Sequence, residues 1–192
     1  MDLGLADARV VVTGGASNIG RGIVHAFAAE GARIVINDID VPQADKVRAE
    51  AKELGAAEVR VVIADLTKPE AAEVAVGAAQ TAWGGLDVLV NNAGWSVPGF
   101  VATDTDRDKW QRTIEINLFS AIAATQAAIP VMKESGGGAM VFIASDAAFG
   151  QIRQGVYGAS KAAMVAFART TAREHGRHGI RSNIICPGLV IP

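Results

Sequence analysis

The chain has 192 residues, of which 50% are hydrophobic and 20% are charged, and its formal net charge is -2. This composition excludes a disordered chain, and the length suits one domain with a core of its own. The weak negative charge provides no basic field for a phosphate backbone, so we expect no nucleic-acid partner.

The N-terminus, the single cysteine and the histidines restrict location and metal chemistry. Met1–Asp7 has neither the basic region nor the apolar region of a signal peptide, and no apolar run approaches the ~20 residues of a membrane span. We therefore expect a cytoplasmic protein with no membrane partner. Cys186 alone cannot form an internal disulfide or a cysteine-built zinc site. We interpret His25, His175 and His178 as surface residues, not metal ligands.

Short apolar runs alternate with longer alanine-rich stretches, as expected for strands covered on both faces and joined by helices. The strands are expected at Arg9–Thr13, Arg33–Asn37, Val59–Ile63, Val88–Asn91, Ala139–Ala144 and Ile184–Cys186. The helices are expected at Ile19–Glu30, Pro42–Leu54, Pro69–Trp83, Asp108–Glu134 and Val156–His175. This pattern predicts an α/β fold, a Rossmann-type doubly wound parallel sheet flanked by helices. No linker or repeat divides residues 1–192, so we expect one domain.

A glycine-rich turn follows the first expected strand. Val10–Thr13 leads directly into Gly14-Gly-Ala-Ser-Asn-Ile-Gly20, after which a helix begins. Glycines let the backbone approach a pyrophosphate, and the helix offers free N–H groups and the positive end of its dipole. The turn therefore predicts a dinucleotide site. An ordinary strand-to-helix turn stays open as the alternative, because glycine is common there.

Asp38 lies at the end of the second expected strand, eighteen residues after Gly20, where such folds place an acid for a ribose. Its carboxylate would accept hydrogen bonds from the ribose hydroxyls and repel a 2′-phosphate, which favours NAD over NADP. Arg21 could offer a compensating charge, or it could face solvent. A second alternative is that Asp38 or Asp40 caps the helix that begins near Pro42.

Tyr157 and Lys161 are four residues apart, which places both side chains on one face of the last expected helix. An ammonium group beside a phenol stabilises the phenolate and lowers the pKa of the phenol from its ordinary value of about 10. The pair is therefore expected to exchange a proton near neutral pH. The four-residue spacing alone is weak evidence for a catalytic pair, and the motifs elsewhere in the sequence strengthen that interpretation.

These motifs, in this order, resemble those of the short-chain dehydrogenase/reductase family in its one-domain form. Thr13–Gly20 resembles the family's Thr-Gly-x-x-x-Gly-x-Gly turn, and Asn91–Gly94 its Asn-Asn-Ala-Gly motif. The further resemblances are Asp65 and Leu66 at the adenine, Asn117, Ser145, the pair Tyr157 and Lys161, and Pro187 with Gly188. The resemblance covers the whole chain and implies the strand order 3-2-1-4-5-6.

The resemblance implies a catalytic set of Asn117, Ser145, Tyr157 and Lys161. Ser145 would donate a hydrogen bond to the substrate oxygen, Tyr157 would act as general acid or base, and Lys161 would lower the tyrosine pKa and bind the nicotinamide ribose. Asn117 would hold a water that links Lys161 to solvent. The coenzyme is expected to be NAD, with NADP less favoured because of Asp38. It would contact Gly14, Ser17, Asn18, Ile19, Asp38, Ile39, Asp65, Leu66, Asn92, Ala93, Gly94, Tyr157, Lys161, Pro187, Gly188 and Val190.

The sequence departs from the family pattern in three places. Asn18 replaces the middle glycine of the turn, and asparagine tolerates the left-handed conformation. Ser145 precedes Tyr157 by twelve residues, one fewer than is commonest in relatives, and a shorter Gly150–Gly155 loop would absorb this. Relatives continue with a substrate-covering segment and a seventh strand, whereas this chain stops at Leu189–Pro192. We therefore expect a single NAD(P)-binding domain without that strand and lid.

The expected function is hydride transfer between NAD(H) and a secondary alcohol or ketone of a small metabolite. Trp95–Pro98, Ala147, Phe149 and Gln151 are expected at the substrate pocket. A 3-oxoacyl thioester reductase, acting on acyl-carrier-protein or CoA thioesters, is one alternative, and a non-catalytic dinucleotide-binding regulatory protein is another. In relatives, the helices equivalent to the last two expected here pair across a two-fold axis. The resemblance thus implies a homodimer or homotetramer.

Overall fold

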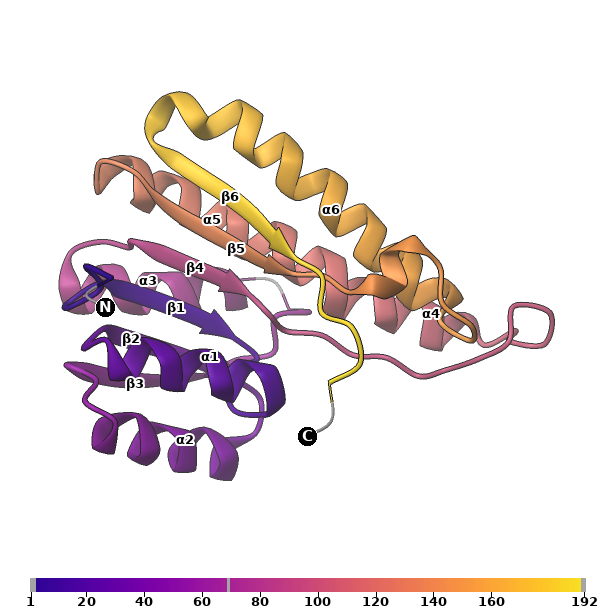
Figure 1. Ribbon diagram of the computed structural model, residues 1–192, viewed down its shortest axis with the longest axis horizontal. Helices are drawn as coiled ribbons and strands as arrows, with labels where there is room; N and C mark the ends of the chain where they lie inside the picture. Colours follow the sequence, from indigo (N-terminus) through magenta and orange to yellow (C-terminus); the bar gives the residue numbers. More distant parts are fainter. Residues whose placement is uncertain (1–2, 69, 191–192) are drawn as a thin grey trace.

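The computed structural model of the protein describes residues 3–68 and 70–190. Within them, six parallel strands form one sheet in the order β3-β2-β1-β4-β5-β6 (Figure 1). The strands are β1 (Arg9–Thr13), β2 (Arg33–Asp38), β3 (Glu58–Ile63), β4 (Val88–Asn91), β5 (Gly138–Ile143) and β6 (Ile180–Ile185). The predicted Rossmann-type sheet and its strand order are confirmed.

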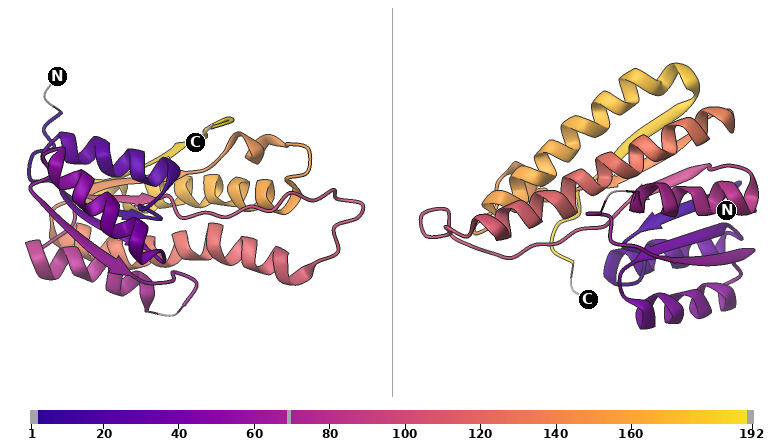
Figure 2. Two further views of the ribbon diagram at one scale, coloured as in Figure 1. Left: turned by 90° about the horizontal axis from the view of Figure 1, so that it is seen from below. Right: turned by 180° about the vertical axis from the view of Figure 1, so that it is seen from behind.

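Helices cover the two faces of this sheet (Figure 2). They are α1 (Asn18–Ala29), α2 (Val41–Glu53), α3 (Ala71–Trp83), α4 (Arg107–Ile114), α5 (Ser120–Glu134) and α6 (Gly155–His175). Alternate residues of β1 belong to two cores: Val10 and Val12 lie in the core with α1 and α2, and Val11 lies in the core with α3, α5 and α6. Both sides of the central strands are therefore buried, which explains their unbroken apolar runs. Pro69, the expected start of the third helix, lies outside the described residues.

The expected long helix is continuous from Arg107 to Glu134, but a π-helical segment, η1 (Glu115–Phe119), separates α4 from α5. Such segments inside α-helices are frequent at functional sites. By length and a mean hydropathy of 1.3 over its apolar part, this helix could span a membrane. Ala124, Ala128 and Met132 of α5 lie in the core, so packing against the sheet accounts for the apolar composition.

The last strand differs from the sequence prediction of a buried strand over Ile184–Cys186. β6 begins four residues earlier, because Ile180–Ile185 pairs along its whole length with Gly138–Ile143 of β5. The polar residues Arg181 to Asn183 conceal this start in the sequence. Alternate residues of β6 are exposed at the edge of the sheet, and Cys186 is exposed rather than buried.

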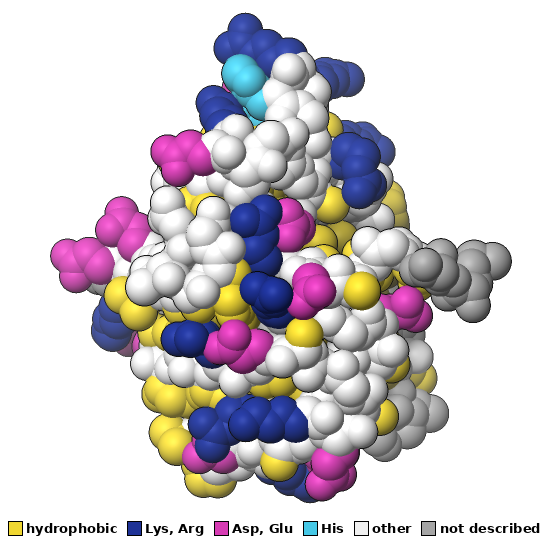
Figure 3. All heavy atoms as spheres, turned by 90° about the vertical axis from the view of Figure 1, so that its left-hand side faces the viewer, with side chains coloured by type: hydrophobic (Ala, Val, Ile, Leu, Met, Phe, Trp, Pro, Cys, Tyr) yellow, Lys and Arg dark blue, Asp and Glu magenta, His cyan; other side chains and the backbone are white. Residues whose placement is uncertain are grey.

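Basic and acidic side chains are interspersed on the face at the amino ends of the strands (Figure 3). Salt bridges join Arg9 to Asp87 at the start of β1 and Arg33 to Asp7 at the start of β2. These pairs fix the strand starts on this face. The carboxyl ends of the strands lie at the opposite side of the molecule.

Candidate functional site

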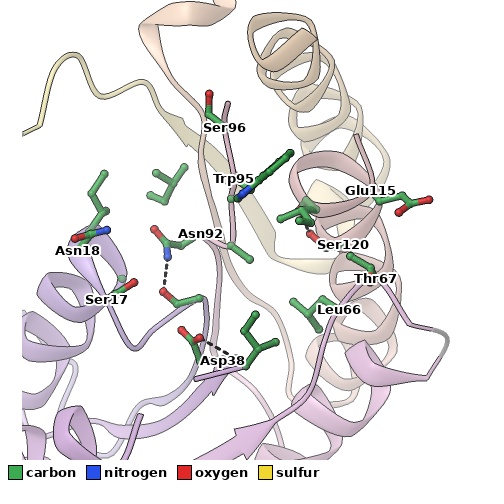
Figure 4. A pocket seen from close by; sticks show the side chains of 18 of the residues that line it. Ser17, Asn18, Asp38, Leu66, Thr67, Asn92, Trp95, Ser96, Glu115 and Ser120 are labelled. Carbon is green, nitrogen blue, oxygen red and sulfur yellow. Dashed lines mark hydrogen bonds between the residues drawn. The ribbon is translucent and has the colours of Figure 1, made fainter. Parts of the chain in front are cut away.

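A cavity of about 890 Å³ lies at the carboxyl ends of the strands, where the strand order reverses between β1 and β4. Open α/β sheets bind ligands at this point. Side chains from α1, from the end of β2 and from the segments after β3 and β4 surround the space (Figure 4). Every residue predicted to contact the coenzyme lines this cavity, and so does Ser145. Asn117 is not among the lining residues.

The glycine-rich turn forms one wall of the cavity. Gly14 has a φ of 60° and Asn18 a φ of 47°, so asparagine adopts the left-handed conformation that the sequence predicted. A Cβ at Gly20 would lie 2.0 Å from the carbonyl oxygen of Gly14, which excludes any larger residue there. Ser17 provides no side-chain cap for α1, so the first N–H groups of the helix remain available to an anion.

Asn92 and Thr13 tie this turn to the segment after β4. The Asn92 amide donates to the carbonyl oxygens of Thr13 at 2.9 Å and Gly14 at 2.8 Å. The Thr13 hydroxyl accepts from the N–H groups of Asn92 and Ala93, both at 3.0 Å. Sequence reasoning missed this role of Thr13, since its partners lie far away along the chain.

The two acids at the end of β2 have separate roles. The Asp38 carboxylate accepts from the N–H groups of Ala16 at 2.9 Å and Ile39 at 2.8 Å, and it lines the cavity. Asp40 instead caps α2 by accepting from the N–H of Gln43 at 3.1 Å. The capping alternative therefore holds for Asp40, and the ribose contact of Asp38 stays a prediction.

Arg21 does not remain a free charge at the turn. Its guanidinium forms two hydrogen bonds, each 2.8 Å long, with the Glu50 carboxylate on α2. Arg21 is the basic residue that the sequence suggested as a partner for a 2′-phosphate, and its guanidinium is therefore already paired with Glu50.

Lys161 is 3% exposed, and its ammonium donates to the carbonyl of Ile143 at 2.8 Å. Burial lowers the pKa of Lys161 to about 8. The nitrogen lies 5.7 Å from the centre of the Tyr157 ring. The sequence predicted that Lys161 lowers the tyrosine pKa, but this is wrong for the protein without coenzyme. Burial raises the pKa of Tyr157, the Ser145 hydroxyl opposes the rise, and the Asp146 carboxylate adds to it.

Ser145 follows β5 and begins a short 3-10 helix, η2 (Asp146–Phe149). Its hydroxyl lies close enough to the Tyr157 phenol to oppose the rise in the phenol pKa, and both side chains line the cavity. The twelve-residue spacing between them therefore still brings serine and tyrosine together.

Asn117 is fully buried in η1 and lies behind the cavity wall. Its amide donates to the carbonyl of Trp95 at 2.9 Å and to the Ser160 hydroxyl at 3.1 Å, and its oxygen accepts from the N–H of Trp95 at 2.7 Å. Ser160 in turn donates to the carbonyl of Tyr157 at 2.6 Å. The polar side-chain atoms of Asn117 are thus used by Trp95 and Ser160, and the expected water for Lys161 stays a prediction. Sequence reasoning missed Ser160.

The far end of the cavity, where the adenine is expected, is more polar than the sequence suggested. Asp65 accepts from the backbone and the hydroxyl of Thr67, and these hydrogen bonds lower the pKa of its carboxyl. The guanidinium of Arg112 lies 5.2 Å from the centre of the Trp95 ring. Sequence reasoning missed the lining residues Thr67, Lys68, Gln111 and Arg112.

The expected substrate-pocket residues separate. Trp95 and Ser96 line the main cavity, whereas Val97 lines a second cavity of about 400 Å³. Tyr157 lines both. Pro98, Ala147, Phe149 and Gln151 line neither of these two. In the described part of the chain, His, Cys, Asp and Glu form no group of three or more that could hold a metal ion.

A family model described as short chain dehydrogenase matches residues 8–191. The chain belongs to the short-chain dehydrogenase family. It is 38% identical over 190 residues to the (2S)-[(R)-hydroxy(phenyl)methyl]succinyl-CoA dehydrogenase subunit BbsD of Thauera aromatica, which covers 98% of this chain and 75% of that protein. It is 37% identical over 184 residues to the D-beta-hydroxybutyrate dehydrogenase of Cupriavidus necator, covering 94% of this chain and 70% of that one.

Solved structures of similar short-chain dehydrogenases share the fold closely. NAD+-bound xylitol dehydrogenase has a TM-score of 0.93 and 31% identity, covering 98% of this chain and 72% of that one. L-Sorbose reductase from Gluconobacter frateurii, complexed with NADPH and L-sorbose, has a TM-score of 0.94 and 33% identity, covering 100% and 73%. This short-chain dehydrogenase is an NAD(P)-dependent oxidoreductase acting on CH–OH groups or the corresponding ketones.

Proposed function

We propose that this short-chain dehydrogenase uses NAD(H) and interconverts a secondary alcohol and a ketone of a small metabolite. The observation that carries the proposal is the arrangement around one cavity. The glycine turn and Asp38 lie at one end, and Ser145, Tyr157 and Lys161 lie at the other. The coenzyme, when bound, supplies or accepts the hydride.

The proposed catalytic roles follow from the atoms that face the cavity. The Ser145 hydroxyl binds the substrate oxygen, and the Tyr157 phenol gives or takes its proton. Lys161 binds the nicotinamide ribose and places a positive charge near the phenol. Asn117 acts through its contacts: it fixes Trp95 and, through Ser160, the backbone of Tyr157. It is a positioning residue.

The proposed preference for NAD rests on Asp38. Backbone N–H groups hold its carboxylate in the cavity wall, and Glu50 holds the guanidinium of Arg21. A 2′-phosphate at this position would meet a fixed negative charge. The remaining proposed coenzyme contacts are the glycine turn and the segments after β3, β4 and β6 that line the same cavity.

A thioester substrate is the second candidate. One relative is named as a dehydrogenase of a succinyl-CoA derivative, which favours a CoA thioester. An NADPH-dependent 3-oxoacyl thioester reductase is disfavoured by Asp38. Comparing free hydroxy acids with their CoA thioesters, with NAD and NADP in parallel, separates these candidates.

We also propose a cytoplasmic homodimer or homotetramer, without a nucleic-acid or membrane partner. Half-buried apolar residues on the continuous helix and on α6, including Ala123, Ala127 and Val165, support pairing of these helices between subunits. Phe119 on the same helix is 56% exposed. Analytical ultracentrifugation tests the assembly, and a monomer at micromolar concentration contradicts it.

The decisive test of function is Tyr157→Phe, which keeps the ring and removes the proton. With a panel of secondary alcohols and ketones, we expect turnover to fall about 10²- to 10⁴-fold. NADH binding, measured by fluorescence titration, should be retained because the other coenzyme contacts remain, and it serves as the control for folding. A variant as active as the parent would refute the role of Tyr157.

A further inference from the structure

The second cavity, of about 400 Å³, adjoins the proposed active site. Tyr157 lines this cavity as well as the main one. Ser96 lines the main cavity, and its hydroxyl donates at 2.7 Å to the side-chain oxygen of Gln154, which lines the second. The boundary between the two cavities is therefore formed by Tyr157 and by the pair of Ser96 and Gln154.

Much of the wall of the second cavity is apolar. The apolar side chains that line it are Val97, Val101, Trp110 and Val156. Binding sites combine such walls with a few placed polar groups that fix the orientation of the ligand. The polar groups of this cavity therefore indicate which ligand it takes.

Two of the three charged residues on this cavity neutralise each other. The Asp104 carboxylate forms an ion pair with the Lys109 ammonium, and the two side chains are only 14% and 17% exposed. Lys109 holds the pKa of the Asp104 carboxyl below its ordinary value. The third charged residue is Arg153, which forms no ion pair within residues 3–68 and 70–190. The second cavity thus carries one positive charge that no acid offsets.

The guanidinium of Arg153 is available to a ligand. Its central carbon lies over the Phe100 ring, 5.2 Å from the ring centre. A contact with a ring face uses the face of the guanidinium and leaves its in-plane N–H groups free. In the part of the chain that the structure describes, none of these groups donates to another residue. Two of them in parallel match the oxygens of a carboxylate.

The backbone at Arg153 is held in an uncommon conformation. Its φ is 65°, in the left-handed region that residues with a Cβ seldom adopt. The carbonyl of Arg153 accepts from the N–H of Gly99 at 2.9 Å. Gly99 packs so closely on Asp104 that a Cβ there would lie 2.4 Å from the carboxylate oxygen. Such conformations persist where the surroundings hold them, and they are frequent at ligand sites.

Gln154 offers a second set of donors beside Arg153. Its side-chain oxygen accepts from Ser96, so the amide nitrogen with its two N–H groups lies at the other end of the carboxamide. Among the described residues this nitrogen has no hydrogen-bond partner. The carbonyl of Gln154 accepts from the N–H of Gly158 at 2.6 Å, which fixes the residue one turn before Tyr157.

We propose that the second cavity binds a carboxylate of the substrate through Arg153 and Gln154, so that the substrate is a hydroxy acid or the corresponding keto acid. The inference rests on the proposed function and names its substrate class. The apolar walls take the carbon chain between the two groups. The carboxylate is not changed in the reaction: the carbinol carbon gives up the hydride, and the hydroxyl gives its proton to Tyr157.

The kinetic test compares straight-chain hydroxy acids, with the hydroxyl at successive positions, with the corresponding primary amides. We expect the parent enzyme to prefer the best acid over its amide about tenfold in kcat/KM, mainly through KM. Arg153→Met removes the charge and keeps a side chain of similar length, and it should abolish this preference. Arg153→Lys should retain most of it. Equal kcat/KM values for acids and amides in the parent would overturn the proposal.

Two further variants separate a direct contact from the general charge of the protein. Arg48→Met removes an exposed arginine of α2 that pairs with Asp45, and the ratio of acid to amide should stay as in the parent. Gln154→Glu still accepts from Ser96 but places a carboxylate at the site, so this ratio should fall. A loss in Arg48→Met as large as in Arg153→Met, or an unchanged ratio in Gln154→Glu, would contradict the contact.

A binding measurement tests the site without turnover. Butyrate and butyramide have no hydroxyl to oxidise, and saturation-transfer NMR detects either on the NADH-bound protein. Butyrate should give the stronger signal, and Arg153→Met should remove the difference. Equal signals in the parent would overturn the proposal, whatever the activity. Binding of butyrate through Arg153, with no turnover of any hydroxy acid or secondary alcohol, would instead refute the proposed function and leave the carboxylate site standing.

Discussion

The ammonium nitrogen of Lys161 lies 5.7 Å from the centre of the Tyr157 ring, one turn further along α6. Its hydrogen bond goes to the main chain at the end of β5 rather than to the phenol. Lys161 is therefore a nearly buried amine whose charged form is disfavoured by burial. The proposed contact with the nicotinamide ribose would account for it.

This amine makes the stability of the fold depend on pH. Because burial lowers the pKa of Lys161 from 10.5 to about 8, the unfolded chain binds more protons than the folded protein between these values. Stability should rise with pH across this window, by roughly 3 kcal/mol in full, and the whole penalty should be present below it.

Lys161→Met should flatten this dependence, whereas Lys52→Met, which removes an exposed lysine of α2, should not. Urea unfolding at about pH 7 and about pH 10 measures the difference. An unchanged slope in Lys161→Met would mean that other groups cause it.

Gly20 and Gly22 on α1 form a matched pair for the coenzyme turn. A Cβ at Gly20 would lie 2.0 Å from the carbonyl oxygen of Gly14, whereas nothing lies within 4 Å of a Cβ at Gly22. Gly20→Ala should cost about 1–3 kcal/mol of stability and displace the turn, with NADH affinity reduced more than about tenfold. Gly22→Ala should stabilise the protein by about 0.5–1 kcal/mol. Thermal unfolding and calorimetric titration check both, and similar behaviour of the two variants would contradict the clash.

Thr13 should matter through its hydroxyl. The residue is 2% exposed, and Thr13→Val leaves the N–H groups of Asn92 and Ala93 without their acceptor. We expect a loss of about 1–3 kcal/mol in the free energy of unfolding and weaker NADH binding. Thr13→Ser keeps the oxygen and should retain most of both. If serine and valine variants unfold at the same urea concentration, the hydroxyl is not what holds the segment.

Asp38 and Asp40 separate coenzyme choice from helix capping. Asp38→Asn removes the charge that would repel a 2′-phosphate. The ratio of NADPH to NADH affinity should therefore rise about tenfold, which corresponds to a binding free energy of about 1.4 kcal/mol. Asp40→Asn removes a charge two residues away and keeps a good N-cap, so this ratio should not change. Equal shifts in both variants would indicate general electrostatics instead of a ribose contact.

The sheet could be predicted because its central strands are buried on both faces and read as unbroken apolar runs. The start of β6 could not, because Arg181, Ser182 and Asn183 are tolerated at an edge where alternate residues are exposed. For the same reason the exposure of Cys186 was missed.

The residues around the main cavity could be predicted because short motifs at strand ends converge at the switch point. The direction of the pKa shift on Tyr157 could not be predicted from the sequence. Helix spacing gives the distance between Tyr157 and Lys161, but it gives neither the burial of the phenol nor the hydrogen-bond partner of the ammonium. The partners of Asn117 were missed because Trp95 and Ser160 lie 22 and 43 residues away in the chain.

Trp95, Asn117, Ser160 and Tyr157 form a continuous series of hydrogen bonds from the segment after β4 to the reacting helix. Chimaeras made with other family members should keep this series of hydrogen bonds within one parent. A chimaera that takes β4 and its following loop from one parent, and α6 from another, would combine hydrogen-bond donors and acceptors from two different proteins. Crossovers placed before β4 and after α6 transfer the set intact.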